Sequence, residues 1–202
     1  MTGRERAGTV DDMARRLRVA PPGGLFHVFA RGVEKRTIFQ SVTDYLAFLA
    51  LLDQVVRCYD WRCRFYCLMG NHFHLFVATA KQTLSEGMQH LSGCYAQRFN
   101  RRYGRKGHLF EDRFGSVMIE TDSQLRELFR YLALNPVRAG FCDAPEDWRW
   151  SSYAATIGLE PPPRFLDIDP VLGLFANDRR VAQQVLAAFV AEGIALDKTR
   201  AA

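Results

Sequence analysis

The stretch Met69-Gly70-Asn71-His72-Phe73-His74-Leu75-Phe76-Val77 decides the fold, because it sets two histidines two residues apart inside an apolar run. Strand side chains alternate between the faces of a sheet, so His72 and His74 would point one way and their apolar neighbours the other. One face could then pack while the other binds. Neutral imidazoles at this spacing could hold one divalent cation. The alternative is a half-buried strand whose imidazoles are hydrogen-bonded.

The residues around this stretch predict a ferredoxin-like α+β fold, an antiparallel sheet with packed helices and a small C-terminal helical extension. Gly70-Asn71 is a tight turn signal that joins two strands into a hairpin. Thr121 begins the last helix of the sandwich, and Pro136 disfavours helical geometry at Asn135, so we expect that helix to end there. The other expected elements are strands over 25–31, 62–69, 72–79 and 116–120, and helices from Thr43 or Asp44 to about 57 and over 84–103.

Three segments follow from composition along the chain. Residues 1–20 are polar and Arg-rich and resemble a basic arm, before Pro21-Pro22-Gly23-Gly24 interrupts any helix. Residues 21–158 would form the catalytic domain. Residues 159–202 would be a linker and helical extension, with one or two small helices over 169–192 closed by Gly193.

Charge and cysteine usage suggest where the protein acts and on what. The chain has five cysteines, an odd number, and no Cys-x-x-Cys pair, which together with the lack of a secretory signal predicts reduced thiols and a cytoplasmic protein. No run approaches the ~18 apolar residues of a membrane span. The net charge of +5 comes from clustered cations, so a polyanion is a reasonable partner.

The last helix of the sandwich carries a phenol and an amide on one side. Tyr131 and Asn135 lie one turn apart beside the apolar stripe. If this helix packs over the histidine face, the two imidazoles and the Asn135 amide oxygen would form a ligand set suited to Mg²⁺ or Mn²⁺. Tyr131 could then attack phosphorus, and Glu127 could assist proton transfer. The alternatives are a core-edge aromatic at Tyr131, a turn residue at Asn135 and a solvated carboxylate at Glu127.

Cations and aromatic rings gather near the end of the helix over 84–103. Cations neutralise phosphates and rings stack on unpaired bases, which suits single-stranded or hairpin DNA. The alternative is a solvated helix end whose cations favour the negative end of the helix dipole. The expected DNA-binding residues are Arg31, Arg36, Arg98, Arg101, Arg102, Tyr103, Arg105, Lys106, His108 and Arg113.

Four ordered motifs together resemble the REP-associated tyrosine transposases, which belong to the single-tyrosine HUH transposase superfamily. The likeness runs from about Pro22 to Gly158, although Gly70 stands where that family usually has proline. The acidic pair Glu111-Asp112 also replaces residues that are usually less acidic. The motifs are Leu25-Phe26-His27-Val28-Phe29-Ala30-Arg31-Gly32, Met69-Gly70-Asn71-His72-Phe73-His74, Gly107-His108-Leu109-Phe110-Glu111-Asp112-Arg113-Phe114 and Arg130-Tyr131-Leu132-Ala133-Leu134-Asn135-Pro136-Val137-Arg138-Ala139-Gly140.

The resemblance implies a metal held by His72 and His74, with Asn135 as third ligand and Tyr131 as nucleophile. We therefore expect a metal-dependent nuclease and strand transferase. It would act on single-stranded DNA, cutting and rejoining hairpin or repeat sequences through a covalent 5′-phosphotyrosine. The alternative is a regulator on the same scaffold that binds DNA or RNA without cutting it. The resemblance and the tail after Gly140 favour a monomer, and a dimer that exchanges tyrosine helices is the other option.

Overall fold

The computed structural model describes residues 23–201, and a four-stranded antiparallel sheet lies at its centre. The strands are β1 (Leu25–Arg31), β2 (Trp61–Leu68), β3 (His72–Thr79) and β4 (Gly115–Ile119). Their order across the sheet is β2, β3, β1, β4, and each neighbouring pair is antiparallel. The histidine-bearing strand β3 is therefore an inner strand, held by hydrogen bonds on both sides.

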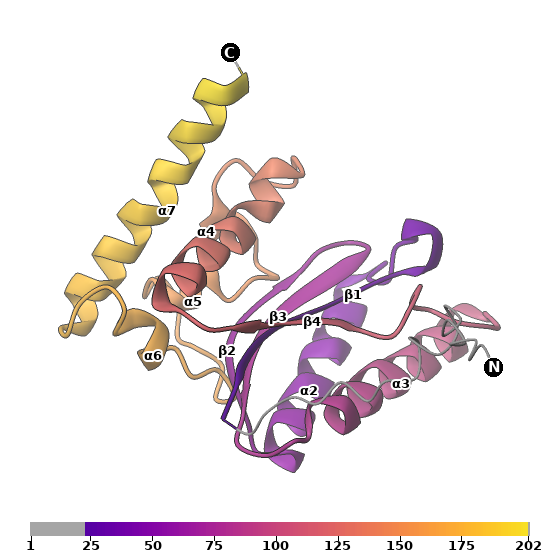
Figure 1. The fold of residues 1–202 in the computed structure, drawn as a ribbon. Helices are drawn as coiled ribbons and strands as arrows, with labels where there is room; N and C mark the ends of the chain where they lie inside the picture. Colours follow the sequence, from indigo (N-terminus) through magenta and orange to yellow (C-terminus); the bar gives the residue numbers. More distant parts are fainter. Residues whose placement is uncertain (1–22, 202) are drawn as a thin grey trace, which may run out of the picture.

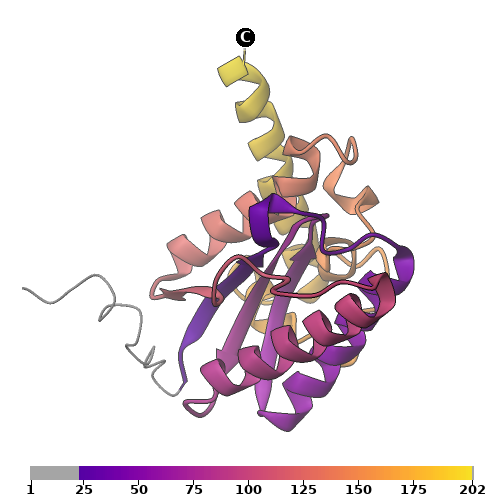
Figure 2. The ribbon, with the colours of Figure 1, turned by 90° about the vertical axis from the view of Figure 1, so that its right-hand side faces the viewer.

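Helices cover both faces of this sheet (Figure 1). The helices α2 (Val42–Cys58) and α3 (Leu84–Tyr103) lie side by side on one face, as Figures 1 and 2 both show. The helix α4 (Asp122–Arg138) lies on the other face, together with the C-terminal helices. The element order and these layers confirm the predicted ferredoxin-like α+β class.

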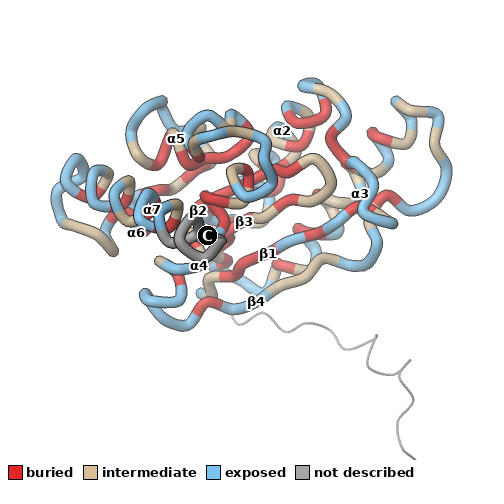
Figure 3. Tube along the Cα trace, turned by 90° about the horizontal axis from the view of Figure 1, so that it is seen from above, coloured by how far each residue is buried: buried red, intermediate tan, exposed pale blue. Residues whose placement is uncertain are grey.

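The two faces of β3 carry different side chains, as the sequence alternation predicts. Phe73 is fully buried and its ring centre lies 4.7 Å from that of Phe48 on α2. Phe76 points to the opposite face, where its ring centre lies 6.4 Å from that of Phe129 on α4. His72 shares the face of Phe76, so the histidine pair lies on the α4 side of the sheet. Figure 3 shows buried stretches along β2 and β3, whereas β4 is mostly exposed or intermediate.

The expected start of α2 at Thr43 or Asp44 is slightly wrong, because the helix begins with Ser41 as its N-cap. Asp44 lies inside the first turn instead. Its carboxylate accepts a hydrogen bond of 2.9 Å from the Ser41 backbone N–H and one of 3.1 Å from the Ser41 hydroxyl. An acidic residue three positions after the N-cap satisfies a backbone donor that the helix leaves unpaired.

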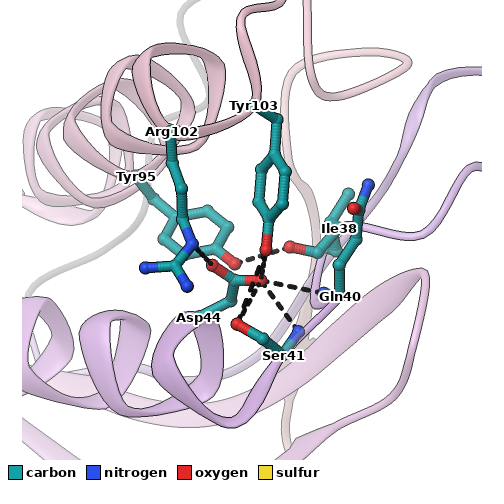
Figure 4. Close-up of polar contacts among 7 residues, drawn as sticks. All are labelled: Ile38, Gln40, Ser41, Asp44, Tyr95, Arg102 and Tyr103. Carbon is teal, nitrogen blue, oxygen red and sulfur yellow. Dashed lines mark hydrogen bonds and ion pairs between the residues drawn. The ribbon is translucent and has the colours of Figure 1, made fainter.

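The same carboxylate ties the end of α3 to the start of α2 (Figure 4). Asp44 is only 3% exposed and also accepts a 2.9 Å hydrogen bond from the Gln40 backbone N–H. The hydroxyl of Tyr103 donates to it over 2.7 Å, and the Arg102 guanidinium lies 3.7 Å from its second oxygen. A buried charge is stable only when it is paired and hydrogen-bonded in this way. The network therefore fixes where the cationic end of α3 sits.

The prediction that α4 ends at Asn135 is wrong, because the helix continues to Arg138 with Pro136 inside it. The carbonyl of Asn135 accepts a 2.9 Å hydrogen bond from the Ala139 N–H, which closes the last turn. A proline this close to a helix end removes a single N–H donor, and the turn still closes around it. Asn135 consequently keeps helical geometry, one turn beyond Tyr131.

The expected helix end at Gly193 is also wrong, because α7 (Arg179–Ala201) passes through this glycine. A Cβ at Gly193 would lie only 2.7 Å from Cδ1 of Leu134 and 3.0 Å from Cδ of Arg130, both on α4. The glycine therefore allows close helix packing and does not cap. The remaining elements are the 3-10 helices η1 (Val33–Lys35) and η2 (Pro145–Asp147), and the short helices α5 (Tyr153–Thr156) and α6 (Asp169–Leu172).

The expected segments can be placed only in part. The basic arm predicted over 1–20 lies outside the described residues. The segment after 158 packs on the rest of the chain, because the Asp167 N–H donates to the Cys63 carbonyl of β2 over 2.8 Å and α7 contacts α4. Among residues 23–201, no helix combines the length and apolarity that crossing a membrane would need.

Candidate active site

A cavity of about 1120 Å³ opens between the inner strands and α4. His72 and His74 of β3 line it together with Tyr131 and Asn135 of α4. The structure thus brings the proposed ligands and the proposed nucleophile, about sixty residues apart in sequence, to one place. The other lining residues are Phe29, Ala30, Arg31, Met69, Glu111, Asp112, Arg113, Gly115, Arg138 and Ala139.

The position of α4 follows from its apolar stripe. Phe129 is fully buried, and its ring centre lies 4.7 Å from that of Phe65 on β2. A neighbouring side of the helix is covered by α7, where the Arg130 guanidinium lies 4.4 Å from the ring centre of Phe189. Tyr131 takes part in neither of these contacts and is 51% exposed. The helix is therefore held from two sides while its phenol stays accessible at the cavity.

Hydrogen bonds orient the two imidazoles through their Nδ1 atoms. Nδ1 of His72 lies 2.6 Å from Oδ1 of Asn71, whose amide nitrogen donates to the Lys35 carbonyl over 3.0 Å. Nδ1 of His74 lies 3.0 Å from Nε2 of His27 on β1. In both rings the bond uses Nδ1, so Nε2 is the nitrogen that remains for a cation.

Burial keeps these histidines neutral. It lowers the pKa of His72 to about 4, with a further lowering from the nearby Arg31 charge. Burial is also the main reason why the pKa of His74 lies well below its ordinary value, followed by the neighbouring histidines and Arg31. Burial lowers the pKa of His27 to about 4. Neutral imidazole is the form that binds metals, so the pair is ready for a cation at neutral pH.

The donor set fits a divalent cation if the third ligand is an amide. Among residues 23–201, no group of three or more His, Cys, Asp or Glu side chains is placed to hold a metal. Asn135 lines the same cavity as the histidine pair, and its amide oxygen could serve as the next protein ligand. Two ring nitrogens and an amide oxygen, with positions left for phosphate oxygens, suit Mg²⁺ or Mn²⁺.

Arg138 and Phe29 are cavity residues to which sequence reasoning assigned no role. The Arg138 guanidinium lies 5.2 Å from the ring centre of Tyr131 and donates to the Tyr131 carbonyl over 3.3 Å. The spacing of seven residues places both on one helix face, which is the signal that could have identified Arg138. Phe29 is 37% exposed on β1 beside His74. An exposed aromatic in this position could stack on a base.

The expected DNA-binding residues fall into separate places. Only Arg31 and Arg113 line the cavity, next to the acidic pair Glu111 and Asp112. His108 lines a second cavity of about 850 Å³ between α3 and the loop over 107–114.

Another group lies outside the first cavity, at or after the end of α3. Arg98, Arg101 and Lys106 are exposed there, and the Arg105 guanidinium lies 5.9 Å from the Phe99 ring centre. Arg102 and Tyr103, also in this group, contact Asp44 as described above.

Arg36, an expected DNA-binding residue, and Glu127, an expected helper in proton transfer, each form an ion pair. Arg36 forms a 2.7 Å ion pair with Glu34 in the turn after β1. Glu127, one helical turn before Tyr131 on α4, pairs with Arg130 and is not among the cavity residues, so its assistance in proton transfer stays a prediction.

Fold and cavity together define the class of protein. The family model described as "Transposase IS200 like" matches residues 24–135, which is more than half of the chain. This range contains His72, His74, Tyr131 and Asn135. The chain belongs to this transposase family.

Particular relatives narrow the resemblance. The chain is 24% identical over 152 residues to the Haemophilus influenzae protein named "Putative REP-associated tyrosine transposase", an alignment that covers 68% of this chain and 84% of that one. A solved structure of a REP-associated tyrosine transposase bound to a REP hairpin superposes with a TM-score of 0.61 at 19% identity, over 77% of this chain and 93% of that chain. At this identity the likeness concerns the fold. The predicted resemblance to REP-associated tyrosine transposases is thereby confirmed.

Proposed function

We propose that this transposase is a metal-dependent nuclease and strand transferase that cuts and rejoins single-stranded hairpin or repeat DNA through a covalent bond to Tyr131. One observation carries the proposal: Tyr131 and Asn135 from α4 line the same cavity as His72 and His74 from β3. A chain that only bound DNA would have no need for a phenol beside two neutral imidazoles.

The residues divide the chemistry between them. His72 and His74 would hold Mg²⁺ or Mn²⁺ through Nε2, and Asn135 would hold it through its amide oxygen. When bound, the cation supplies Lewis acidity to the scissile phosphate. The Tyr131 oxygen then forms a bond to phosphorus while the bond to the 3′ oxygen breaks. The proton leaves the phenol for solvent or an acceptor, and the 3′ oxygen departs as a hydroxyl after taking up a proton.

Rejoining is the same reaction in reverse. The phosphotyrosyl ester keeps the energy of the broken bond, so a 3′ hydroxyl can attack it and release Tyr131 without a nucleotide cofactor. Arg138 stacks on the Tyr131 ring and would hold the phenol in place during both steps. Arg31 and Arg113 supply positive charge at the cavity for the DNA phosphates.

The proposed substrate class draws on charge and on one relative. The solved relative described above is bound to a REP hairpin. In the present chain, exposed arginines on α3 add cations outside the cavity, and Phe29 offers a ring inside it. We propose hairpin DNA with a single-stranded flank as substrate. We also propose that a monomer suffices, because both halves of the cavity come from one chain.

The test is adduct formation on a labelled hairpin with Mn²⁺, followed by denaturing electrophoresis. A 5′-phosphotyrosine retains the downstream fragment, so only the strand labelled at its 3′ end should yield labelled protein. Tyr131→Phe should bind the hairpin and form no adduct. The matched control is Tyr59→Phe, because Tyr59 is partly buried at the end of α2 and lines no part of the cavity.

The outcomes separate the alternatives. Binding without cleavage in the wild type, with and without Mn²⁺, would indicate the regulator that binds without cutting. An adduct that survives Tyr131→Phe would remove Tyr131 from the role of nucleophile. Undiminished cleavage in a chelator would remove the metal from the proposal.

A further inference from the structure

His27 lies behind the histidine pair, on the neighbouring inner strand β1. In the register of β1 and β3, His27 is opposite Phe76 and Phe29 is opposite His74. His27 and His74 are therefore diagonal neighbours on one face of the sheet, and their ring centres are 5.2 Å apart. Nε2 of His27 lies 3.0 Å from Nδ1 of His74. His27 is 9% exposed and does not line the cavity.

Two ring nitrogens at this distance bond only when one of them carries the hydrogen and the other does not. If His74 gives the lone pair of Nε2 to a cation, its hydrogen must be on Nδ1. His27 must then accept with a bare Nε2 and carry its own hydrogen on Nδ1. The opposite arrangement would put a hydrogen on Nε2 of His74 and prevent that atom from binding a cation.

Nδ1 of His72 also has a hydrogen-bond partner, but this partner is an oxygen that carries no hydrogen. Its Nδ1 lies 2.6 Å from Oδ1 of Asn71. The Asn71 amide nitrogen donates to the Lys35 carbonyl, which leaves Oδ1 to face the ring, and an amide oxygen can only accept. The hydrogen of His72 is thus on Nδ1, and Nε2 is bare. For Nε2 to carry no hydrogen on both rings, His27 must accept the Nδ1 hydrogen of His74, as Asn71 accepts that of His72.

We propose that His27 is a positioning residue, which accepts the Nδ1 hydrogen of His74 and so turns the lone pair of Nε2 toward the cation. This inference rests on the proposed metal-dependent function. His27 would not bind the cation itself, because it does not line the cavity. The rings of Phe29 and Phe76 also contact His27, and Val117 of β4 is its partner in the sheet register. If the role of His27 were packing alone, an aromatic ring without an acceptor would serve equally well in this place.

The experiment therefore compares three chains: the wild type, His27→Phe and His27→Gln. Phenylalanine keeps the ring and removes the acceptor, whereas the glutamine amide oxygen can accept near the position of Nε2. Binding of Mn²⁺ without DNA is followed by the paramagnetic resonance of free Mn²⁺. Removing a partner that orients a metal-binding histidine weakens affinity by about 10–100-fold. We expect this loss for His27→Phe and recovery of most of the affinity for His27→Gln.

A second readout does not need the metal. Long-range nitrogen–proton NMR of the histidine rings in the metal-free wild type should show His74 with its hydrogen on Nδ1 and His27 with its hydrogen on Nδ1. In His27→Phe the His74 ring should no longer be restricted to that form. His90→Phe is the control for the exchange of a histidine for a ring, because His90 lies on α3 against Tyr59 and lines neither cavity.

Each result decides one of the two proposals. Equal Mn²⁺ affinity in folded His27→Phe and wild type would overturn the positioning role, as would a wild-type His74 with its hydrogen on Nε2. If the wild type bound no Mn²⁺ at all, the proposed metal-dependent function would fail, and the NMR result would still decide the bond between His27 and His74. If His27→Phe failed to fold, the wild-type spectrum would still decide the proposal through the position of the His74 hydrogen.

Discussion

The two faces of strand β3 differ in what they need from the chain. On one face, Phe73 is fully buried against Phe48 of α2 and contacts Phe110, so its role is packing. On the other face, His72 and His74 are less buried and each is fixed by one hydrogen bond at Nδ1. The apolar face requires only size and hydrophobicity, which many residues supply. The histidine face requires particular atoms in particular places.

The difference suggests that stability and activity can be separated on a single strand. A change on the apolar face should cost folding free energy and affect the site only through unfolding. A change at His72 or His74 should cost little folding free energy and remove a specific function. The expected effects range from a large loss of folding free energy on the apolar face to a small change in DNA affinity at the end of α3.

Adjacent residues of β3 provide the strongest test. Phe73→Ala removes a fully buried ring and leaves a cavity, so the free energy of unfolding should fall by about 3–5 kcal/mol. His74→Ala removes one hydrogen bond to His27, and the loss should be about 1 kcal/mol. His74→Ala should nevertheless abolish Mn²⁺-dependent adduct formation. Urea unfolding measures the first effect and the adduct assay the second. If His74→Ala lowered the free energy of unfolding as much as Phe73→Ala, stability and activity would not be separate on β3.

The Asp44 network should come next. Asp44→Ala leaves the Tyr103 hydroxyl and two backbone N–H groups without their acceptor, which should cost about 2–3 kcal/mol of unfolding free energy. Tyr103→Phe removes one of these bonds and should cost about 1 kcal/mol. If the two side chains act through this bond, the double variant should lose less than the sum of the single ones. Additive losses would show that the Tyr103 bond contributes nothing.

The contact between α7 and α4 is the next in size. Gly193→Val places side-chain atoms where Leu134 and Arg130 of α4 already lie, and the strain should lower the free energy of unfolding by about 1–2 kcal/mol. Glu192→Val introduces the same side chain at the exposed neighbouring position, and because valine has a higher helix propensity than glycine, propensity alone would not destabilise Gly193→Val. Thermal unfolding of both variants measures the difference. Equal melting temperatures would mean that α7 does not pack closely on α4 in solution.

The smallest effect concerns the cations at the end of α3. Arg101→Ala should weaken hairpin binding several-fold and reduce the slope of log K against log salt by about 0.7–0.9, the value expected for one lost phosphate contact. Arg180→Ala removes an exposed arginine from α7, on the other side of the sheet, and should leave the slope unchanged. Equal slopes for the two variants would exclude the end of α3 from the DNA interface.

The parts of the fold that sequence patterns predict are those set by local periodicity. Alternation in β3 predicts which face carries the histidine pair, and the apolar stripe of α4 predicts that Tyr131 flanks a buried contact. Where sequence reasoning failed, the deciding contact is remote or the local rule depends on position. Pro136 is tolerated because it falls in the last turn of α4. Gly193 is explained by helix packing against α4 and not by helix termination.

The candidate site follows the same division. The His-x-His spacing and the interval between Tyr131 and Asn135 can be read directly from the chain, because each lies within one element. The contact of His27 with His74 cannot, because it depends on the register of two strands that are 47 residues apart. The same holds for the loop that brings Glu111 and Arg113 to the cavity. Sequence reasoning therefore identified the residues within each element and expected α4 to meet the histidine pair, but it did not identify the contacts of His27 or of the loop over 107–114.

The central claim is that the histidine pair and Tyr131 of one chain act together, and mixing two inactive variants tests it most directly. His72→Ala keeps the phenol and Tyr131→Phe keeps the histidine pair, so neither alone should form a covalent adduct with hairpin DNA and Mn²⁺. Because both halves of the cavity come from the same chain, we predict that an equimolar mixture also forms none. An adduct on Tyr131 of the His72→Ala chain in the mixture would show that the site is shared between two chains and would contradict this account.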